Sequence, residues 1–155
     1  MQEYNKTGIL SKKDITLPNK KQMQKGVAVI ECIQKIPCNP CVDSCPVNAI
    51  TMKDINAPPK IDFDTCIGCG KCVGICPGLA IFLVKIIENN KALITLPYEM
   101  LPIPKIDDIV DGLNREGKKI DDVRVVKSKK VGKTYLVTIK TKEKLSNDIR
   151  NIKVK

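Results

Sequence analysis

Residues 66–77 read Cys66-Ile67-Gly68-Cys69-Gly70-Lys71-Cys72-Val73-Gly74-Ile75-Cys76-Pro77. The four cysteines are separated by two, two and three residues, and a proline follows the last of them. Three thiols at this spacing can meet in one tight loop, whereas the fourth follows a helical turn and points away from that loop. The stretch therefore predicts a compact unit that is organised around sulfur atoms.

A second copy of this pattern stands earlier in the chain. Residues 38–46 align with residues 69–77 at an offset of 31. Cys32 corresponds to Cys66 at an offset of 34, so the first copy has three extra residues between its first two cysteines. Such an internal repeat predicts two similar halves. Short apolar runs flank each copy, and we expect them to form strands at Val27–Ile30, Ile50–Met52, Ile61–Phe63 and Ile81–Val84.

The composition narrows the chemistry that these cysteines can perform. The 155 residues include 8 Cys and no His, which excludes Cys/His zinc fingers, Rieske centres and histidine-based acid–base catalysis. The N-terminus is polar, and no apolar run approaches the roughly 18 residues that a membrane span requires. We therefore expect a cytoplasmic protein without a membrane span, in which closely spaced thiols bind metal rather than form disulfides.

The spacing of residues 66–77 is that of cysteine runs that bind [4Fe–4S] clusters, in which the fourth cysteine serves the neighbouring cluster. Applied to both copies, this rule predicts two [4Fe–4S] clusters with exchanged ligands. Cluster I would be held by Cys32, Cys38, Cys41 and Cys76, and cluster II by Cys66, Cys69, Cys72 and Cys45. Two four-cysteine zinc sites are the alternative, but such sites prefer paired C-x2-C knuckles.

The residues between the predicted ligands lead to two further predictions. Gly68, Gly70 and Gly74 are expected to let backbone N–H groups approach the cluster sulfurs, with ordinary turns as the alternative. The five residues 33–37 between Cys32 and Cys38 replace the usual two. We expect this longer loop to cover one face of cluster I, where it would alter the reduction potential of that cluster or exclude solvent from it.

The residues outside the two cysteine repeats have a different sequence pattern. Ser11 is a candidate helix cap, and residues 19–25 predict a short helix that ends at Gly26. After the repeats, turn signals separate four strand-like segments, and a fifth follows a helical turn or two within residues 142–150. These strands are expected at Lys91–Leu96, Ile106–Val110, Lys119–Lys127, Lys133–Lys140 and around Ile152 and Val154. The fold class is therefore α+β, with residues 1–26 as an N-terminal extension, 27–90 as a dicluster domain and 91–155 as a small antiparallel β-rich docking module.

The net charge of +10 is unevenly distributed. Residues 1–26 carry six basic and two acidic groups, residues 27–96 carry six of each, and residues 97–155 carry fifteen basic and nine acidic groups. Only three of the 27 basic residues are arginines, the side chain best suited to bidentate contacts with phosphates and bases. The charge therefore favours an acidic protein partner over nucleic acid, with a solvated lysine surface that only keeps the protein soluble as the alternative.

Residues 27–84 resemble a two-cluster bacterial-type ferredoxin, and the resemblance implies a pseudo-twofold pair of βαβ units. The chain departs from that family at the long spacing between Cys32 and Cys38. Two stretches of sequence narrow the resemblance to one group of proteins. These stretches are Lys25-Gly26-Val27-Ala28-Val29-Ile30-Glu31-Cys32-Ile33-Gln34-Lys35-Ile36-Pro37-Cys38-Asn39-Pro40-Cys41 and Leu96-Pro97-Tyr98-Glu99-Met100-Leu101-Pro102. They are similar to dicluster subunits of anaerobic FAD-dependent amino-acid or amine dehydrogenase complexes of the sarcosine oxidase and proline dehydrogenase type.

The resemblance implies an electron-transfer subunit that relays single electrons to or from a flavin-containing oxidoreductase partner. It has no catalytic site of its own, because the flavin subunits of such complexes perform the chemistry. Two alternatives stay open: a free-standing soluble ferredoxin, and a nucleic-acid-binding protein in which the clusters are structural. The additional residues after Leu96 argue against the first, since a diffusing carrier needs only the cluster fold.

Overall fold

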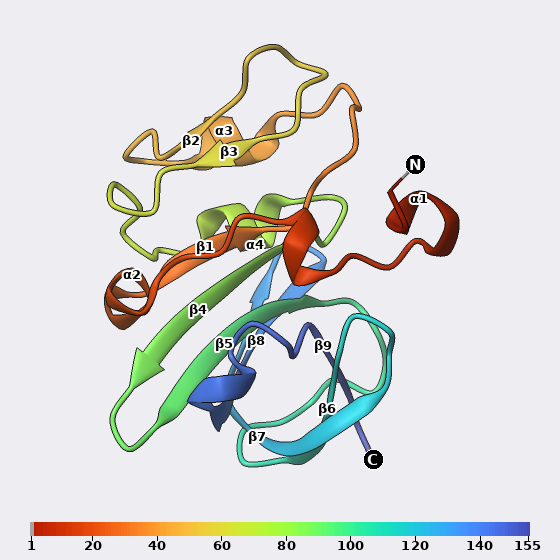
Figure 1. Cartoon of the computed structure of the whole chain (residues 1–155). Helices are drawn as coiled ribbons and strands as arrows, with labels where there is room; N and C mark the ends of the chain where they lie inside the picture. Colours follow the sequence, from red (N-terminus) through yellow and green to blue (C-terminus); the bar gives the residue numbers. More distant parts are fainter. Residues whose placement is uncertain (1) are drawn as a thin grey trace.

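The computed structural model describes residues 2–155. It contains a seven-stranded antiparallel sheet with the strand order β1-β4-β5-β8-β7-β6-β9, a two-stranded sheet of β2 and β3, and a few short helices. Figure 1 shows β2, β3 and α3 at one end of the molecule, β6, β7 and β9 at the other, and β1, α4 and β4 between them. No helix within residues 2–155 is long and apolar enough to cross a membrane.

The cysteine-bearing half consists of two strand–helix–strand units. Its elements are β1 (Val27–Ile30), α3 (Pro40–Ser44), β2 (Ile50–Thr51), β3 (Lys60–Ile61), α4 (Lys71–Ile75) and β4 (Ile81–Ile87). β1 pairs with β4, with Val27 opposite Val84, and β2 pairs with β3, with Ile50 opposite Ile61. Strands therefore flank both cysteine loops, as predicted, and each short helix begins within its loop.

The C-terminal half is mostly sheet. Its elements are β5 (Lys91–Tyr98), β6 (Ile109–Leu113), β7 (Lys119–Val131), β8 (Thr134–Lys142), the 3-10 helix η2 (Glu143–Leu145) and β9 (Asn151–Lys153). All five predicted strands exist, but the one expected at Ile106–Val110 begins only at Ile109. The reason is a turn, in which the Asp108 carboxylate accepts a hydrogen bond from the Lys105 N–H at 2.8 Å and Asp107 has a φ of 74°.

The two halves meet at β4. This strand pairs with β1 on one side and with β5 on the other, so the large sheet runs from the cysteine-bearing half into the C-terminal half. The predicted boundary between residues 90 and 91 falls at the turn between β4 and β5, where Asn89 and Asn90 have positive φ values. The division into residues 1–26, 27–90 and 91–155 stays a prediction, and its last two parts share one sheet.

The N-terminal segment contains α1 (Tyr4–Thr7), the 3-10 helix η1 (Lys12–Asp14) and α2 (Lys20–Lys25). The predicted helix at residues 19–25 is confirmed, with a capping box between Asn19 and Gln22 and Gly26 at its end. Ser11 caps η1 in the same way. The segment is tied to both halves, because Lys25 Nζ donates to the backbone O of Asp64 at 2.6 Å and Lys12 Nζ donates to Asp148 at 2.9 Å.

Candidate metal centres

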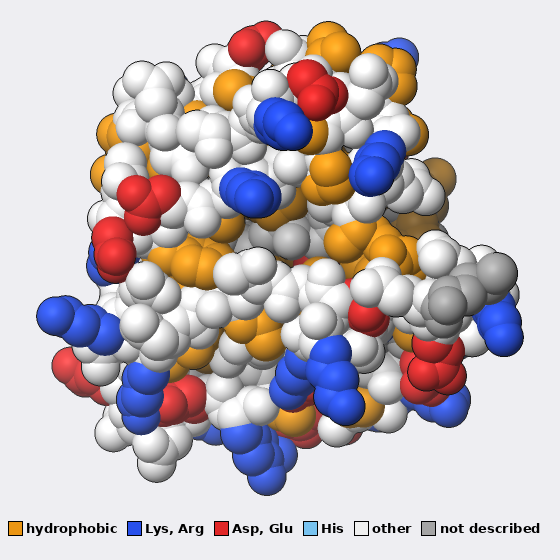
Figure 2. All heavy atoms as spheres, turned by 45° about the horizontal axis from the view of Figure 1, so that its top comes forward, with side chains coloured by type: hydrophobic (Ala, Val, Ile, Leu, Met, Phe, Trp, Pro, Cys, Tyr) orange, Lys and Arg blue, Asp and Glu red, His pale blue; other side chains and the backbone are white. Residues whose placement is uncertain are grey.

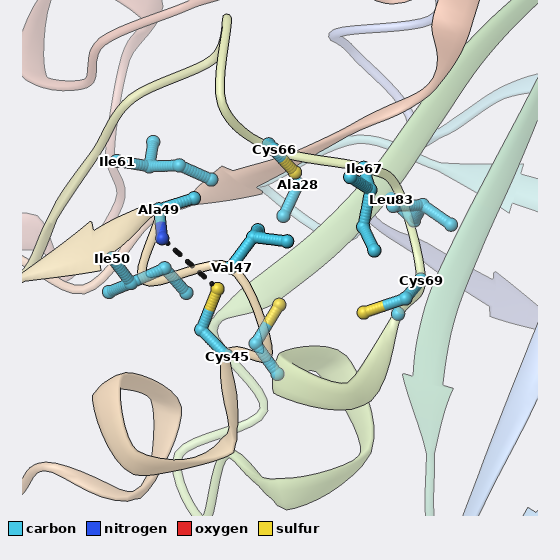
Figure 3. Close-up of a pocket in the computed structure, with 12 residues that line it drawn as sticks. Ala28, Cys45, Val47, Ala49, Ile50, Ile61, Cys66, Ile67, Cys69 and Leu83 are labelled. Atoms are coloured by element: carbon cyan, nitrogen blue, oxygen red, sulfur yellow. Dashed lines mark hydrogen bonds between the residues drawn. The ribbon is translucent and has the colours of Figure 1, made fainter.

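One cavity brings together four of the predicted ligands, which are Cys45, Cys66, Cys69 and Cys72. Figure 3 shows the sulfur atoms of Cys45, Cys66 and Cys69 around the same space. The rest of the lining is glycine or apolar: Ala28, Val47, Ala49, Ile50, Ile61, Ile67, Gly70 and Leu83. The cavity therefore combines three thiols of the second repeat with one thiol of the first.

The other four cysteines also lie near one another. Cys32, Cys38 and Cys76 line a second cavity, which Glu31 and Ile36 also border. Cys41 is buried beside them: burial raises the pKa of its thiol to about 11, with further contributions from the nearby thiols of Cys76, Cys32 and Cys38. This group again contains three cysteines of one repeat and one of the other.

Burial raises the pKa of the thiols that point inward and so favours their protonated form. It raises the pKa of Cys72 to about 12, and the neighbouring thiols of Cys66 and Cys69 raise it further. Burial also raises the pKa of Cys32, against the opposing hydrogen bond from the backbone of Gln34. A thiolate at these positions needs a nearby cation, so metal binding there must displace protons.

Cys45 differs from the other cysteines because the backbone surrounds its sulfur. Burial raises the pKa of its thiol, but backbone hydrogen bonds outweigh this effect and the net shift is downward. Four residues provide those bonds: Val47, Ala49, Ile50 and Asn48. The Ala49 N–H donates to Cys45 Sγ at 3.2 Å (Figure 3). Donors of this kind stabilise a thiolate and the metal group bound to it.

Two of the three glycines assigned to the cluster sulfurs have another structural reason. A Cβ on Gly68 would lie 2.6 Å from the backbone O of Gly26, and the φ of Gly68 is 68°, so this loop packs directly on the end of α2. A Cβ on Gly74 would lie 3.1 Å from Cγ1 of Val131, so this glycine admits the tip of the β7–β8 hairpin onto α4. Gly70, with a φ of 77°, begins α4.

The two thiol-lined cavities fit a multi-iron group. Within residues 2–155, no three Cys, Asp or Glu side chains lie close enough together to share a single metal ion. A [4Fe–4S] cluster places each of its four thiolates on a different iron, so its ligands stand around a cavity rather than around a point. The chemistry of the donors, all thiols, is what iron–sulfur clusters require.

The structure adds a buried ion triad that the sequence analysis did not identify. The carboxylate of Glu31 accepts hydrogen bonds from Arg115 Nη2 at 2.5 Å and from Arg150 Nε at 2.7 Å. These arginines lie 84 and 119 residues away from Glu31 along the chain. No local pattern connects them, so only the position of Glu31, directly before Cys32, could have drawn attention to it.

Comparisons with known proteins agree with this reading of the cysteines. Residues 31–80 match the family model described as 4Fe-4S dicluster domain. The ferredoxin-type protein NapF of Haemophilus influenzae is 42% identical over 61 residues, which cover 37% of this chain and 35% of that protein. The polyferredoxin-like subunit of the aliphatic sulfonate oxidoreductase of Pyrococcus furiosus is 40% identical over 53 residues, which cover 34% and 31%.

An uncharacterized ferredoxin of Methanocaldococcus jannaschii is 48% identical over 44 residues, which cover 28% of each chain. No solved structure matches the chain. The chain thus spans about a third of the length of the curated relatives that it matches. Residues 31–80 are thus similar to a 4Fe–4S dicluster domain and to segments of ferredoxin-type proteins.

Proposed function

We propose that the protein carries two [4Fe–4S] clusters and relays single electrons to or from a flavin-containing oxidoreductase partner. The supporting observation is that the eight cysteines form two groups of four, each with three members from one repeat and one from the other. Cluster I is assigned to Cys32, Cys38, Cys41 and Cys76, and cluster II to Cys66, Cys69, Cys72 and Cys45. This exchange of ligands is what a pseudo-twofold arrangement of the two βαβ units requires.

When bound, such clusters supply one-electron redox chemistry. The protein's own side chains provide the surroundings in which this chemistry takes place. Ile50, Ile61 and Leu83 line the cavity of the second group and keep water away from it. The thiols of Cys41 and Cys72 belong to different groups, yet they are near enough for one to raise the pKa of the other. The two cavities are therefore neighbours, which supports serial electron transfer between them.

We assign residues 91–155 to partner docking, in the cytoplasm, and expect the partner to be an acidic flavoprotein. The tip of the β7–β8 hairpin lies over α4, and its lysines are exposed: Lys127, Lys129, Lys130 and Lys133. Arg115 and Arg150 bind Glu31, and Arg124 Nη1 lies 3.5 Å from Asp107. Every arginine of the described chain therefore has an acidic partner within the protein, which favours a protein partner over nucleic acid.

On the face drawn in Figure 2, positive charge is not gathered in one patch. The Lys and Arg side chains of this face are scattered among other residues, and hydrophobic side chains border a hollow near its centre. Nucleic-acid sites typically concentrate positive charge on one face. The likeness to subunits of FAD-dependent amino-acid or amine dehydrogenases is part of this proposal. The sulfonate oxidoreductase relative is itself named as a subunit.

Metal analysis tests the cofactor part of the proposal. Protein purified without oxygen should contain about eight iron atoms and about eight acid-labile sulfides per chain. Reduction with dithionite should bleach its visible absorption and produce an EPR signal of reduced [4Fe–4S] clusters. Zinc at about two atoms per chain, with no visible charge-transfer absorption, would show that the cysteines form zinc sites instead.

Isolation of the native protein without oxygen tests the partner part. We expect a flavoprotein to co-purify in a constant ratio and to exchange electrons with the clusters in a rapid-mixing experiment. A protein that elutes alone with both clusters reducible would support the free-standing ferredoxin. Salt-dependent binding of the isolated protein to DNA or RNA would favour the nucleic-acid reading.

A further inference from the structure

The ion triad of Glu31, Arg115 and Arg150 is almost completely shielded from solvent. The side chains of these residues are 8%, 11% and 4% exposed. Arg115 holds the carboxylate with two donors, since its Nε lies 3.1 Å from Glu31 Oε2 and its Nη2 lies 2.5 Å from Oε1. Arg150 approaches the same Oε1 at 2.7 Å. Two guanidinium groups therefore share one carboxylate, and the triad has a net charge of +1.

The triad is held rigidly. Arg150 Nη1 donates to the backbone O of Ser146 at 3.0 Å and of Ile149 at 2.8 Å, and its guanidinium lies 5.1 Å from the centre of the Phe82 ring. Burial lowers the pKa of Arg150, while Glu31 opposes that shift. Arginine side chains keep their charge in proteins, so the Arg150 guanidinium stays positive despite its burial.

One member of the triad, Glu31, lines a thiol-lined cavity, and it lines only one of the two. Glu31 lines the cavity of Cys32, Cys38 and Cys76, and its backbone N–H donates to the O of Ala80 at 2.8 Å. The cavity of Cys45, Cys66, Cys69 and Cys72 is lined by no charged residue of the described chain. The two sites therefore differ in the fixed charge beside them.

We propose that the triad raises the reduction potential of cluster I, and so separates it from that of cluster II. This inference rests on the proposed function, because it requires both clusters. An added electron makes a cluster more negative, and a buried positive charge beside it stabilises that reduced form. The low exposure of the three side chains weakens the screening of this effect by salt. Neither arginine lines that cavity, and both contact Glu31 instead, so Arg115 and Arg150 are positioning residues.

Two substitutions with opposite charge effects test the inference. Arg115→Gln removes a positive charge and leaves Glu31 bound to Arg150, whereas Glu31→Gln removes the negative charge. In an anaerobic redox titration followed by EPR, Arg115→Gln should lower the ratio of reduced to oxidised cluster I roughly tenfold at a fixed applied potential, which is a shift of about 59 mV. Glu31→Gln should shift cluster I in the opposite direction. Cluster II should keep its midpoint in both variants.

Two further variants separate the charge from the packing. Arg115→Lys keeps the charge but loses the two-donor contact, so its midpoint should stay near that of the unmodified protein. Arg124→Gln removes a positive charge from an exposed pair with Asp107 and should leave both midpoints unchanged. If Glu31→Gln fails to fold because two buried arginines lose their partner, Arg115→Gln and Arg115→Lys decide the question.

The inference is wrong if Arg115→Gln leaves cluster I unchanged, if both clusters shift equally, or if Arg115→Gln and Glu31→Gln shift cluster I in the same direction. A purely structural role of the triad would produce one of these results. The proposed function fails separately, when the unmodified protein shows no pair of EPR-active clusters in the same titration.

Discussion

The two hydrophobic cores of this protein differ in the side chains that form them. The core of the cysteine-bearing half includes three buried cysteines, Cys41, Cys66 and Cys72, among mostly small and aliphatic side chains. The core of the C-terminal half contains no cysteine and consists of closely packed aliphatic and aromatic side chains: Phe82, Ile94, Leu96, Tyr98, Val110, Val123, Val125, Val137, Ile139, Ile149 and Ile152. We expect the first core to be completed by what the thiols bind, and the second to be complete as polypeptide.

The two cores are nevertheless joined through one strand. Val84 and Ile86 of β4 belong to the first core, and Phe82 of the same strand belongs to the second. The buried triad forms another link, because Glu31 comes from the first half and its two arginines from the second. The two halves therefore share one strand and one ion triad, which couple the packing of one half to that of the other.

Removal of iron should have the largest effect, and it should affect the two cores differently. We expect anaerobic chelation to unfold the loops and short strands of residues 27–84, because buried thiols without metal cannot replace the cluster. Amide hydrogen exchange should remain slow at Ile94, Val125 and Ile139, which are fully buried in the second core. Slow exchange throughout residues 27–84 in the iron-free protein would show that the first core is also complete as polypeptide.

Substitution of a single ligand should disrupt one cluster, and for Cys45 and Cys76 this should be the cluster of the other repeat. Cys45→Ser should damage the cluster of the second repeat, and Cys76→Ser that of the first, because each cysteine lies with the thiols of the other repeat. Each variant should retain about four iron atoms per chain, and EPR of the reduced protein identifies which cluster remains. Loss of the cluster of the substituted residue's own repeat would show that ligands are not exchanged.

A cavity in the second core should lower stability without affecting the cofactors. Ile139 is fully buried, and Ile139→Ala should reduce the free energy of unfolding by about 2–5 kcal/mol. The visible absorption of the clusters should be unchanged in the absence of denaturant. Ile120→Ala, at a position that is 37% exposed, is the control and should cost at most about 0.5 kcal/mol. Denaturant titration followed by circular dichroism measures both.

A smaller effect is expected where the first core contacts the N-terminal segment. Gly68→Ala should cost about 2 kcal/mol, because its φ is 68° and the new Cβ would lie 2.6 Å from a backbone oxygen. Gly78→Ala is a matched control, since a Cβ there meets no atom within 4 Å and its φ is not positive. Equal stability of the two variants in a denaturant titration would show that the contact with Gly26 is not needed.

Much of this architecture could be predicted from local sequence. The cysteine spacing predicted a dicluster domain and grouped the thiols in two sets of four. Apolar runs and turn residues predicted every strand, although β3 covers Lys60–Ile61 rather than Ile61–Phe63, and Asn19 and Gly26 marked the ends of α2. The start of β6 was predicted too early, because the apolar residues Ile103 and Ile106 are part of an irregular segment that the Lys105–Asp108 turn terminates. Side-chain-to-backbone bonds of this kind override an apolar pattern.

The sequence by itself determined the candidate ligands, the repeat, the helix caps and the succession of strands along the chain, because each depends on residues a few positions apart. Only the tertiary structure decided which segments and side chains are neighbours in space. It joined β4 to both halves, placed Gly68 against Gly26, and brought Arg115 and Arg150 to the residue before Cys32. Contacts over such separations come from the folding of the whole chain, and no spacing or periodicity along the sequence records them.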